Sequence, residues 1–184
     1  ASASSQPGGN RLLLDDAVYE DGAVAVALPP GLGARPLVSQ GCRPVGEPFT
    51  VTEAKENFLI GLGGRPAVER LRDLVSAADE RTRSLIGRGL HIGVVVDEQR
   101  EAFELGDFLI RAVLGVDPSQ GWVAVGDRVP VGTTVQFQVR DAATASAELR
   151  TLVQPLRADS ALVFTCNGRG TNLFGRSGHD AENL

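Results

Sequence analysis

The chain has 184 residues, of which 42% are hydrophobic and 22% charged, and its formal net charge is −5. This composition is that of an ordinary globular protein and excludes a fibrous or disordered chain. The acidic balance argues against a nucleic-acid partner, which would need basic residues gathered on one face. Apolar runs such as Ala23 to Leu28 are far shorter than the roughly 20 residues that cross a bilayer, so we expect no membrane insertion.

The cysteines and histidines define the redox setting and the metal chemistry that can be expected. Cys42 and Cys166 lack the dense spacing of a secreted disulfide scaffold, which favours a reduced, cytoplasmic location. His91 and His179 complete no zinc-ligand pattern with them, and we expect neither a metal nor another cofactor. The start of the chain carries no methionine and no signal-peptide pattern, which predicts a processed chain or a fragment.

The first quarter of the chain is predicted to hold short strands and a long irregular segment. Residues 1–10 are rich in Ser, Gly and Pro and are expected to form a flexible end. Strands are predicted at Arg11 to Leu14, Ala17 to Tyr19 and Ala23 to Leu28, with a hairpin turn at Asp21-Gly22. The prolines and glycines between Pro29 and Pro48 predict a linker or a shaped loop.

Strands and two helices alternate along the rest of the chain. Further strands are predicted at Phe49 to Glu53, Asn57 to Leu62, Leu90 to Val96, Phe108 to Leu114, Trp122 to Val125, Thr133 to Val139 and Ala161 to Thr165. Apolar residues at helical spacing predict one helix after Pro66 and another that Asp141 caps and Pro155 ends. Val135, Phe137 and Val139 alternate with polar residues, which predicts a solvated face. The fold class is therefore α/β (α+β), a mixed, largely antiparallel β-sheet with helices packed against it.

The segment Cys166-Asn167-Gly168-Arg169-Gly170, after the last predicted strand, carries the most chemistry. Its glycines permit positive φ and close backbone approach to a ligand. Arg169 offers a planar guanidinium that suits a carboxylate or a phosphate. A cradle for an anionic or polar ligand and a tight turn with a solvated arginine both fit this pattern.

The sequence FTCNGRG at Phe164 to Gly170, followed by NLFG and by His179-Asp180, resembles the signature of the C-terminal FIST domain. GCRPVG at Gly41 to Gly46, followed by FTVT, is similar to the junction between the N-terminal and C-terminal FIST domains. GDFLIRAVLGVD from Gly106 and GTTVQFQVRDA from Gly132 resemble the middle of the family's pattern. These matches follow the family's order over residues 40–184.

The resemblance implies a bacterial-type, intracellular sensory domain that binds a small-molecule ligand, such as an amino acid or a related metabolite, and signals to a partner protein. It divides the chain into the C-terminal part of a FIST N-terminal domain at residues 11–52 and a FIST C-terminal domain at residues 53–184. The family's pattern continues past Leu184, which predicts that the second domain is truncated.

The resemblance also assigns the candidate binding site. Its centre is expected at Cys166, Asn167, Gly168, Arg169 and Gly170. Arg43 and Arg111 are second-rank candidates, because a guanidinium in a loop or in an apolar strand can meet either an anionic ligand or a carboxylate of the protein itself.

Two other classes of function stay open at this stage, although we expect no catalytic residue. In an enzyme, Cys166 would be the nucleophile, His179 the base and Asp180 the group that orients the base. In an interaction scaffold, the Pro-rich segment with Arg35 and Arg43 would contact a protein partner. Nucleotide chemistry is not expected, because no phosphate-binding glycine motif is complete and Lys55 is the only lysine.

Overall fold

The computed structural model describes residues 8–31, 33, 35–100, 102–104, 106–165 and 168–184. The chain divides into two compact units. One spans Val38–Thr151 and is called the barrel unit here; the other, called the flanking unit, contains the residues before and after it.

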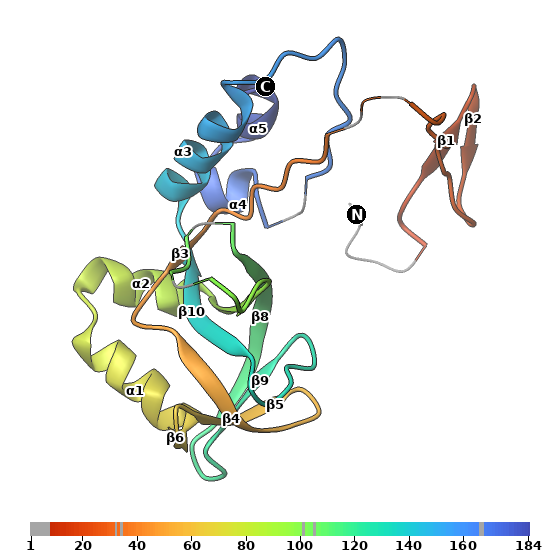
Figure 1. Cartoon of the computed structure of the whole chain (residues 1–184). Helices are drawn as coiled ribbons and strands as arrows, with labels where there is room; N and C mark the ends of the chain where they lie inside the picture. Colours follow the sequence, from red (N-terminus) through yellow and green to blue (C-terminus); the bar gives the residue numbers. More distant parts are fainter. Residues whose placement is uncertain (1–7, 32, 34, 101, 105, 166–167) are drawn as a thin grey trace. The chain divides into compact units, whose positions relative to one another are not determined.

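The barrel unit is built on an eight-stranded sheet (Figure 1). Its strands are β3 (Cys42–Pro44), β4 (Phe49–Lys55), β5 (Phe58–Leu62), β6 (Arg65–Pro66), β7 (Leu90–Val95), β8 (Phe108–Asp117), β9 (Trp122–Val125) and β10 (Thr134–Arg140). The order β10, β4, β5, β9, β8, β7 closes into a barrel because β7 also pairs with β10. Every pairing is antiparallel, which confirms the predicted fold class.

The core of the barrel unit lies on the inward faces of these strands. Val135, Phe137 and Val139 of β10 are fully buried, as their alternation predicts. The prediction that the other face of this strand is solvated is wrong at Gln138, which is only 1% exposed. The reason is that β10 is paired on both sides and also contacts α2 (Glu80–Arg88), so little of its outer face reaches water.

Three helices belong wholly or mostly to the barrel unit: α1 (Ala67–Ala77), α2, and α3 (Ala142–Val153). Leu71 and Leu74 of α1 pack against the core, which confirms the helix expected after Pro66. The helix expected after Asp141 is α3, and the Asp141 carboxylate accepts a hydrogen bond from the Ala143 N–H at 3.1 Å. Helix α2 was not predicted, although Asp79 marks its start by accepting from the Thr82 N–H at 2.6 Å.

The flanking unit contains a hairpin of β1 (Leu12–Leu14) and β2 (Ala17–Tyr19), and two short helices, α4 (Thr171–Phe174) and α5 (His179–Glu182). The hairpin turns at Asp15-Asp16, where Asp15 has a φ of 52°. The expected turn at Asp21-Gly22 is therefore wrong, and Ala23 to Leu28 lies outside any strand. The short carboxylate side chain lets aspartate adopt the left-handed conformation that such a turn requires.

The strand expected at Ala161 to Thr165 is also wrong, since these residues are in neither helix nor strand. Phe164 is 84% exposed, so its apolar side chain is not covered by a described residue. β-Branched and aromatic residues favour a strand only where a neighbouring strand is present to pair with them. No such pairing is found among the residues that the structure describes.

Candidate functional site

One residue of the motif and three residues after it form a compact arrangement of side chains that we call the C-terminal cluster: Arg169, Phe174, His179 and Asp180. Gly170, with a φ of 71°, begins helix α4, which carries Phe174. Gly178, with a φ of 75°, begins helix α5, which carries His179 and Asp180. Both glycines adopt a backbone conformation that residues with a Cβ rarely reach, and the chain can therefore reverse tightly on each side of Phe174.

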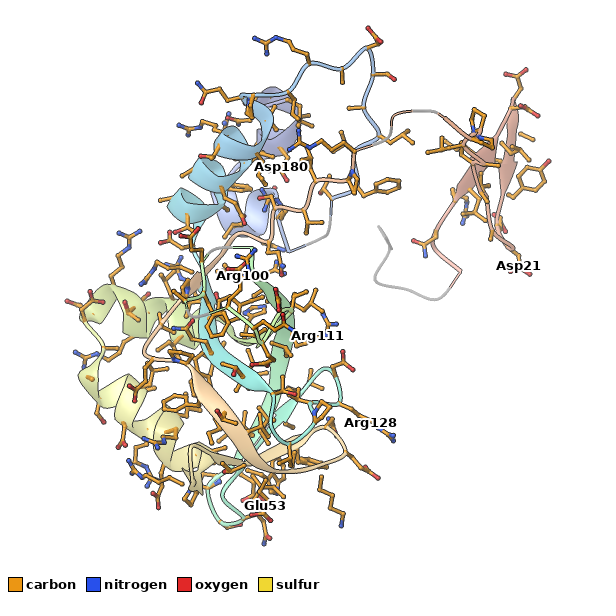
Figure 2. The ribbon with its side chains drawn as sticks, in the orientation of Figure 1. Asp21, Glu53, Arg100, Arg111, Arg128 and Asp180 are labelled. Carbon is orange, nitrogen blue, oxygen red and sulfur yellow. The ribbon has the colours of Figure 1, made fainter. Side chains whose placement is uncertain are left out.

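The guanidinium of Arg169 donates two hydrogen bonds to the carboxylate of Asp180, one to each oxygen. Nε lies 2.5 Å from Oδ2 and Nη2 lies 2.7 Å from Oδ1. The two side chains are only 9% and 14% exposed, so water competes little for this pair. The hydrogen bond from Arg169 holds the pKa of the Asp180 carboxyl below its usual range, and a contact with His179 acts in the same direction. Asp180 is labelled in Figure 2.

Two aromatic rings complete the C-terminal cluster. The His179 ring stacks on the Phe174 ring, with 3.5 Å between their centroids and 9° between their planes. His179 Nδ1 lies 3.0 Å from Asp180 Oδ1, and the Arg169 guanidinium lies 5.3 Å from the centre of the Phe174 ring. The cluster therefore holds a guanidinium and an imidazole against one aromatic ring, and the Asp180 carboxylate contacts both of these groups.

The predicted centre of the site is described only in part. Gly168, Arg169 and Gly170 are half-buried, and Arg169 and Gly170 belong to the C-terminal cluster and its turn. Cys166 and Asn167 lie outside the described residues. Phe174 was missed as a candidate, although it stands five positions from both Arg169 and His179 in a glycine-rich segment.

Arg43 was expected in a loop but lies in the short strand β3, which pairs with β10, and its guanidinium meets a carboxylate of the barrel unit. Nε is 3.5 Å from Asp141 Oδ2, and Nη2 is 3.1 Å from the Thr82 hydroxyl. Arg81 also donates to both oxygens of Asp141, each at 3.2 Å. The side chain of Asp141 is 8% exposed, so this is a largely buried carboxylate between two arginines. Sequence reasoning identified Asp141 only as a helix cap and missed Arg81.

Arg111, which is labelled in Figure 2, lies in β8. It forms a different ion pair, with Asp127 in the segment after β9. Nε is 2.7 Å from Oδ2, and the Arg111 side chain is 33% exposed. The hydrogen bond from Arg111 lowers the pKa of Asp127, as does one from the Arg128 backbone N–H. Arg111 thus faces partly to solvent and has a carboxylate of the protein as its partner.

Among the residues that the structure describes, no group of three or more His, Cys, Asp or Glu side chains stands close enough together to hold a metal ion. None of the described helices has the length and apolar character needed to cross a membrane.

The fold and the motif define a class: an antiparallel α+β barrel protein with a glycine-rich C-terminal motif. The FIST N domain family matches residues 1–65 and the FIST C domain family matches residues 67–184. The chain therefore belongs to the FIST family, whose domains are sensory domains of signal transduction. The boundary expected between residues 52 and 53 lies within β4 and stays a prediction.

Curated relatives of the chain come from mycobacteria. The uncharacterized protein Mb0898c of Mycobacterium bovis is 47% identical, and the uncharacterized protein Rv0628c of Mycobacterium tuberculosis is 46% identical, each over 189 residues. Each match covers 100% of this chain and 49% of the relative, so the chain spans about half the length of these relatives. No solved structure matches the chain.

Proposed function

We propose that this chain is part of a cytoplasmic sensory protein that binds a small molecule, an amino acid or a related metabolite, and signals to a partner protein. Membership of the FIST family supports the sensory role. The observation that carries the proposal is the two-pronged hold of Arg169 on a carboxylate, within the motif that the family shares. This geometry is the one that a guanidinium uses to recognise the carboxylate of a ligand.

In the proposed mechanism, the carboxylate of the ligand replaces that of Asp180 on Arg169. The exchange keeps the charge-assisted hydrogen bonds of the guanidinium, so its free-energy cost is smaller than that of leaving a nearly buried arginine without a partner. Cys166, Asn167, Gly168 and Gly170 would supply the remaining contacts. Release of Asp180 would free helix α5, which carries it, and thereby give a partner protein a second conformation to read.

Arg43 and Arg111 remain second-rank candidates for ligand contact. Both guanidiniums already have carboxylate partners in the barrel unit, Asp141 and Asp127. Their first role is therefore to stabilise the fold. A contribution to binding would require a ligand anion to join or displace those carboxylates.

A thermal-shift screen of the chain against amino acids and organic acids tests this proposal, because a ligand that binds the native state raises its melting temperature. At least one ligand that stabilises the parent chain should lose its effect in Arg169→Lys, which keeps the charge but not the planar fork. Arg176→Lys is the matched control, since Arg176 pairs with Glu182 in the same segment and its side chain is 54% exposed. An equal shift in all three proteins would contradict the assigned site.

A cysteine-dependent enzyme is the second candidate, favoured by one observation. His179 Nδ1 lies 3.0 Å from Asp180 Oδ1, which is the contact that orients a catalytic base. Rapid alkylation of Cys166 together with turnover of a thioester or an amide would support this function. Saturable binding without turnover would support the sensor.

A further inference from the structure

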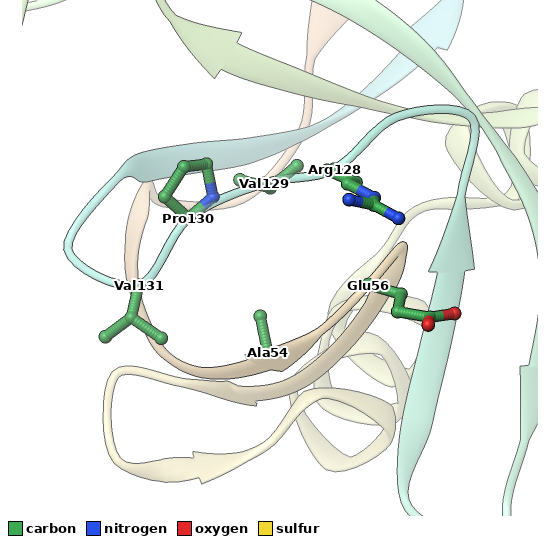
Figure 3. Close-up of a pocket in the computed structure, with 6 residues that line it drawn as sticks. All are labelled: Ala54, Glu56, Arg128, Val129, Pro130 and Val131. Carbon is green, nitrogen blue, oxygen red and sulfur yellow. The ribbon is translucent and has the colours of Figure 1, made fainter.

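A hollow of about 340 Å³ opens on the barrel unit, between β4 and the segment that joins β9 to β10 (Figure 3). Its lining consists of Ala54, Glu56, Arg128, Val129, Pro130 and Val131. The volume falls within the range of about 300–1,000 Å³ that is usual for small-molecule sites. No residue of the C-terminal cluster lines it.

Backbone hydrogen bonds hold the two walls of this hollow together. The Val51 N–H donates to the Thr133 carbonyl and the Gly132 N–H donates to the Val51 carbonyl, both at 2.8 Å. At the other end, the Val125 N–H donates to the Asn57 carbonyl at 2.9 Å, and Asn57 Nδ2 returns a bond to the Val125 carbonyl at 3.0 Å. The hollow is therefore formed in advance of any ligand, which lowers the entropy cost of binding.

The backbone of β4 is irregular where it lines the hollow. Its pairing register with β5 shifts between Val51 and Ala54, which marks a β-bulge. Glu56, at the turn that follows, has a φ of 54°, an uncommon conformation for a residue with a Cβ. Bulges re-aim side chains, and strained residues gather at binding sites, so both features are of the kind that functional sites show.

The two charged residues stand at one end of the hollow and Val131 stands at the other (Figure 3). Among the described residues, the side chains of Glu56 and Arg128 have neither a salt bridge nor a hydrogen bond. Asp127 does not neutralise Arg128, because its carboxylate is held by Arg111 Nε at 2.7 Å and by the Arg128 backbone N–H at 2.8 Å. A guanidinium and a carboxylate are thus both available to a ligand beside an apolar floor.

We propose that this hollow binds a small aliphatic carboxylate that carries a hydrogen-bond donor, an amine or a hydroxyl, on the carbon next to its carboxylate. Arg128 receives the ligand carboxylate on its planar fork, and Glu56 accepts the hydrogen bond of the donor. The aliphatic tail lies over Ala54, Pro130 and Val131, where its burial releases water. This inference goes beyond the proposed function, since the two sites share no residue.

Titrations followed by ¹⁵N–¹H correlation spectra of the 184-residue chain test the site directly. The probes are L-valine, (S)-2-hydroxy-3-methylbutanoate, isovalerate, which lacks the donor, and isobutylamine, which lacks the carboxylate. Amide signals of residues 52–57 and 126–133 should shift saturably with valine or with the hydroxy acid. The probe that binds more tightly shows whether the site prefers an amine or a hydroxyl as the hydrogen-bond donor. Isovalerate and isobutylamine should bind at least about tenfold more weakly, because each lacks one charge-assisted contact.

Variants separate this site from other sources of binding. Arg128→Gln and Glu56→Gln, both exposed positions, should weaken the better probe at least about tenfold while the spectrum stays that of a folded chain. Arg83→Gln, at an exposed position of α2, is the matched control and should leave binding unchanged. The inference is overturned if no probe shifts these amides at millimolar concentration, if both site variants bind as the parent does, or if the shifts fall on residues 168–184.

Discussion

At the scale of single residues, the pair of Arg169 and Asp180 makes the stability of the C-terminal cluster depend on pH. Arg169 lowers the pKa of Asp180, so the pair stabilises the fold above the unfolded carboxyl's pKa of about 3.9 and loses this contribution as the pH falls through the folded value. We expect the hydrogen-exchange protection factors of residues 168–184 to decrease when the pH is lowered past about 4.

Asp180→Asn isolates this effect. It should lower the free energy of local unfolding near neutral pH by about 1–3 kcal/mol and remove most of the pH dependence. Glu182→Gln is the matched control, because its pair with Arg176 is exposed at both ends, and it should change little. Protection that declines equally with pH in Asp180→Asn and in the parent chain would show that another group titrates.

Asp141 combines two roles, which a pair of substitutions separates. Asp141→Asn keeps a side chain that caps α3 but removes the charge that faces Arg43 and Arg81. We expect it to cost about 1–2 kcal/mol, because the side chains of Arg43 and Arg81 are 34% and 68% exposed and water can solvate both guanidiniums once the charge is gone. Asp141→Ala should cost about 1 kcal/mol more, because it also removes the cap. Equilibrium urea unfolding measures the free energy of unfolding of both variants. Equal stability of Asp141→Asn and the parent chain would mean that the ion pairs contribute nothing.

At the scale of elements, alanine substitutions at two strand glycines of the barrel unit should differ in their effect on stability. A Cβ on Gly93 of β7 would lie 2.8 Å from Gln138 Nε2 and 3.0 Å from Phe108 Cβ. Gly93→Ala should therefore lower the melting temperature through a loss of about 1–3 kcal/mol. Gly115 of β8 has open space at the same point, so Gly115→Ala should change stability by less than about 0.5 kcal/mol. A tolerated Gly93→Ala would mean that β7, β8 and β10 pack less tightly than the structure shows.

The sequence predicts most strands of the barrel unit and both strands of the β1–β2 hairpin, but it misses β3 and β6, which are only three and two residues long. Helix α1 and strands β4, β5 and β7 to β10 follow from apolar periodicity, because their apolar faces are buried in one core. Ala161 to Thr165 has the same strand-forming composition but no strand beside it, and composition alone cannot reveal that difference. Helix α2 was missed because Arg81, Arg83 and Arg88 make it polar, so that its cap at Asp79 was the main signal.

The candidate site, too, could be predicted from the sequence only in part. The motif marks Arg169, whose planar fork predicts a carboxylate partner. That this partner is Asp180 depends on the turns at Gly170 and Gly178, which bring residues eleven positions apart into contact. The hollow beside Glu56 and Arg128 could not be predicted from the sequence, because its two walls lie far apart in the chain and meet only through the pairing of β4 with β10 and of β5 with β9.

At the scale of the whole molecule, the barrel unit should be an independent folding unit. Its sheet closes on itself and encloses a core in which Val51, Leu62, Ile92 and Phe137 are fully buried. A fragment of residues 38–153, which includes all of α3, should unfold cooperatively in urea with the near-ultraviolet signal of Trp122 intact. A fragment without a cooperative transition would show that the flanking unit is required for the barrel to fold.

The central claim is that the motif around Arg169 binds a small carboxylate in a sensory protein. Titration calorimetry of the chain with the best ligand from the thermal-shift screen, in the parent and in Arg169→Lys, measures that claim most directly. We predict saturable binding to the parent, at least about tenfold weaker in Arg169→Lys and unchanged in Arg176→Lys, with the ligand recovered intact. Equal affinity in Arg169→Lys would contradict the assigned site, and conversion of the ligand would contradict the sensory role.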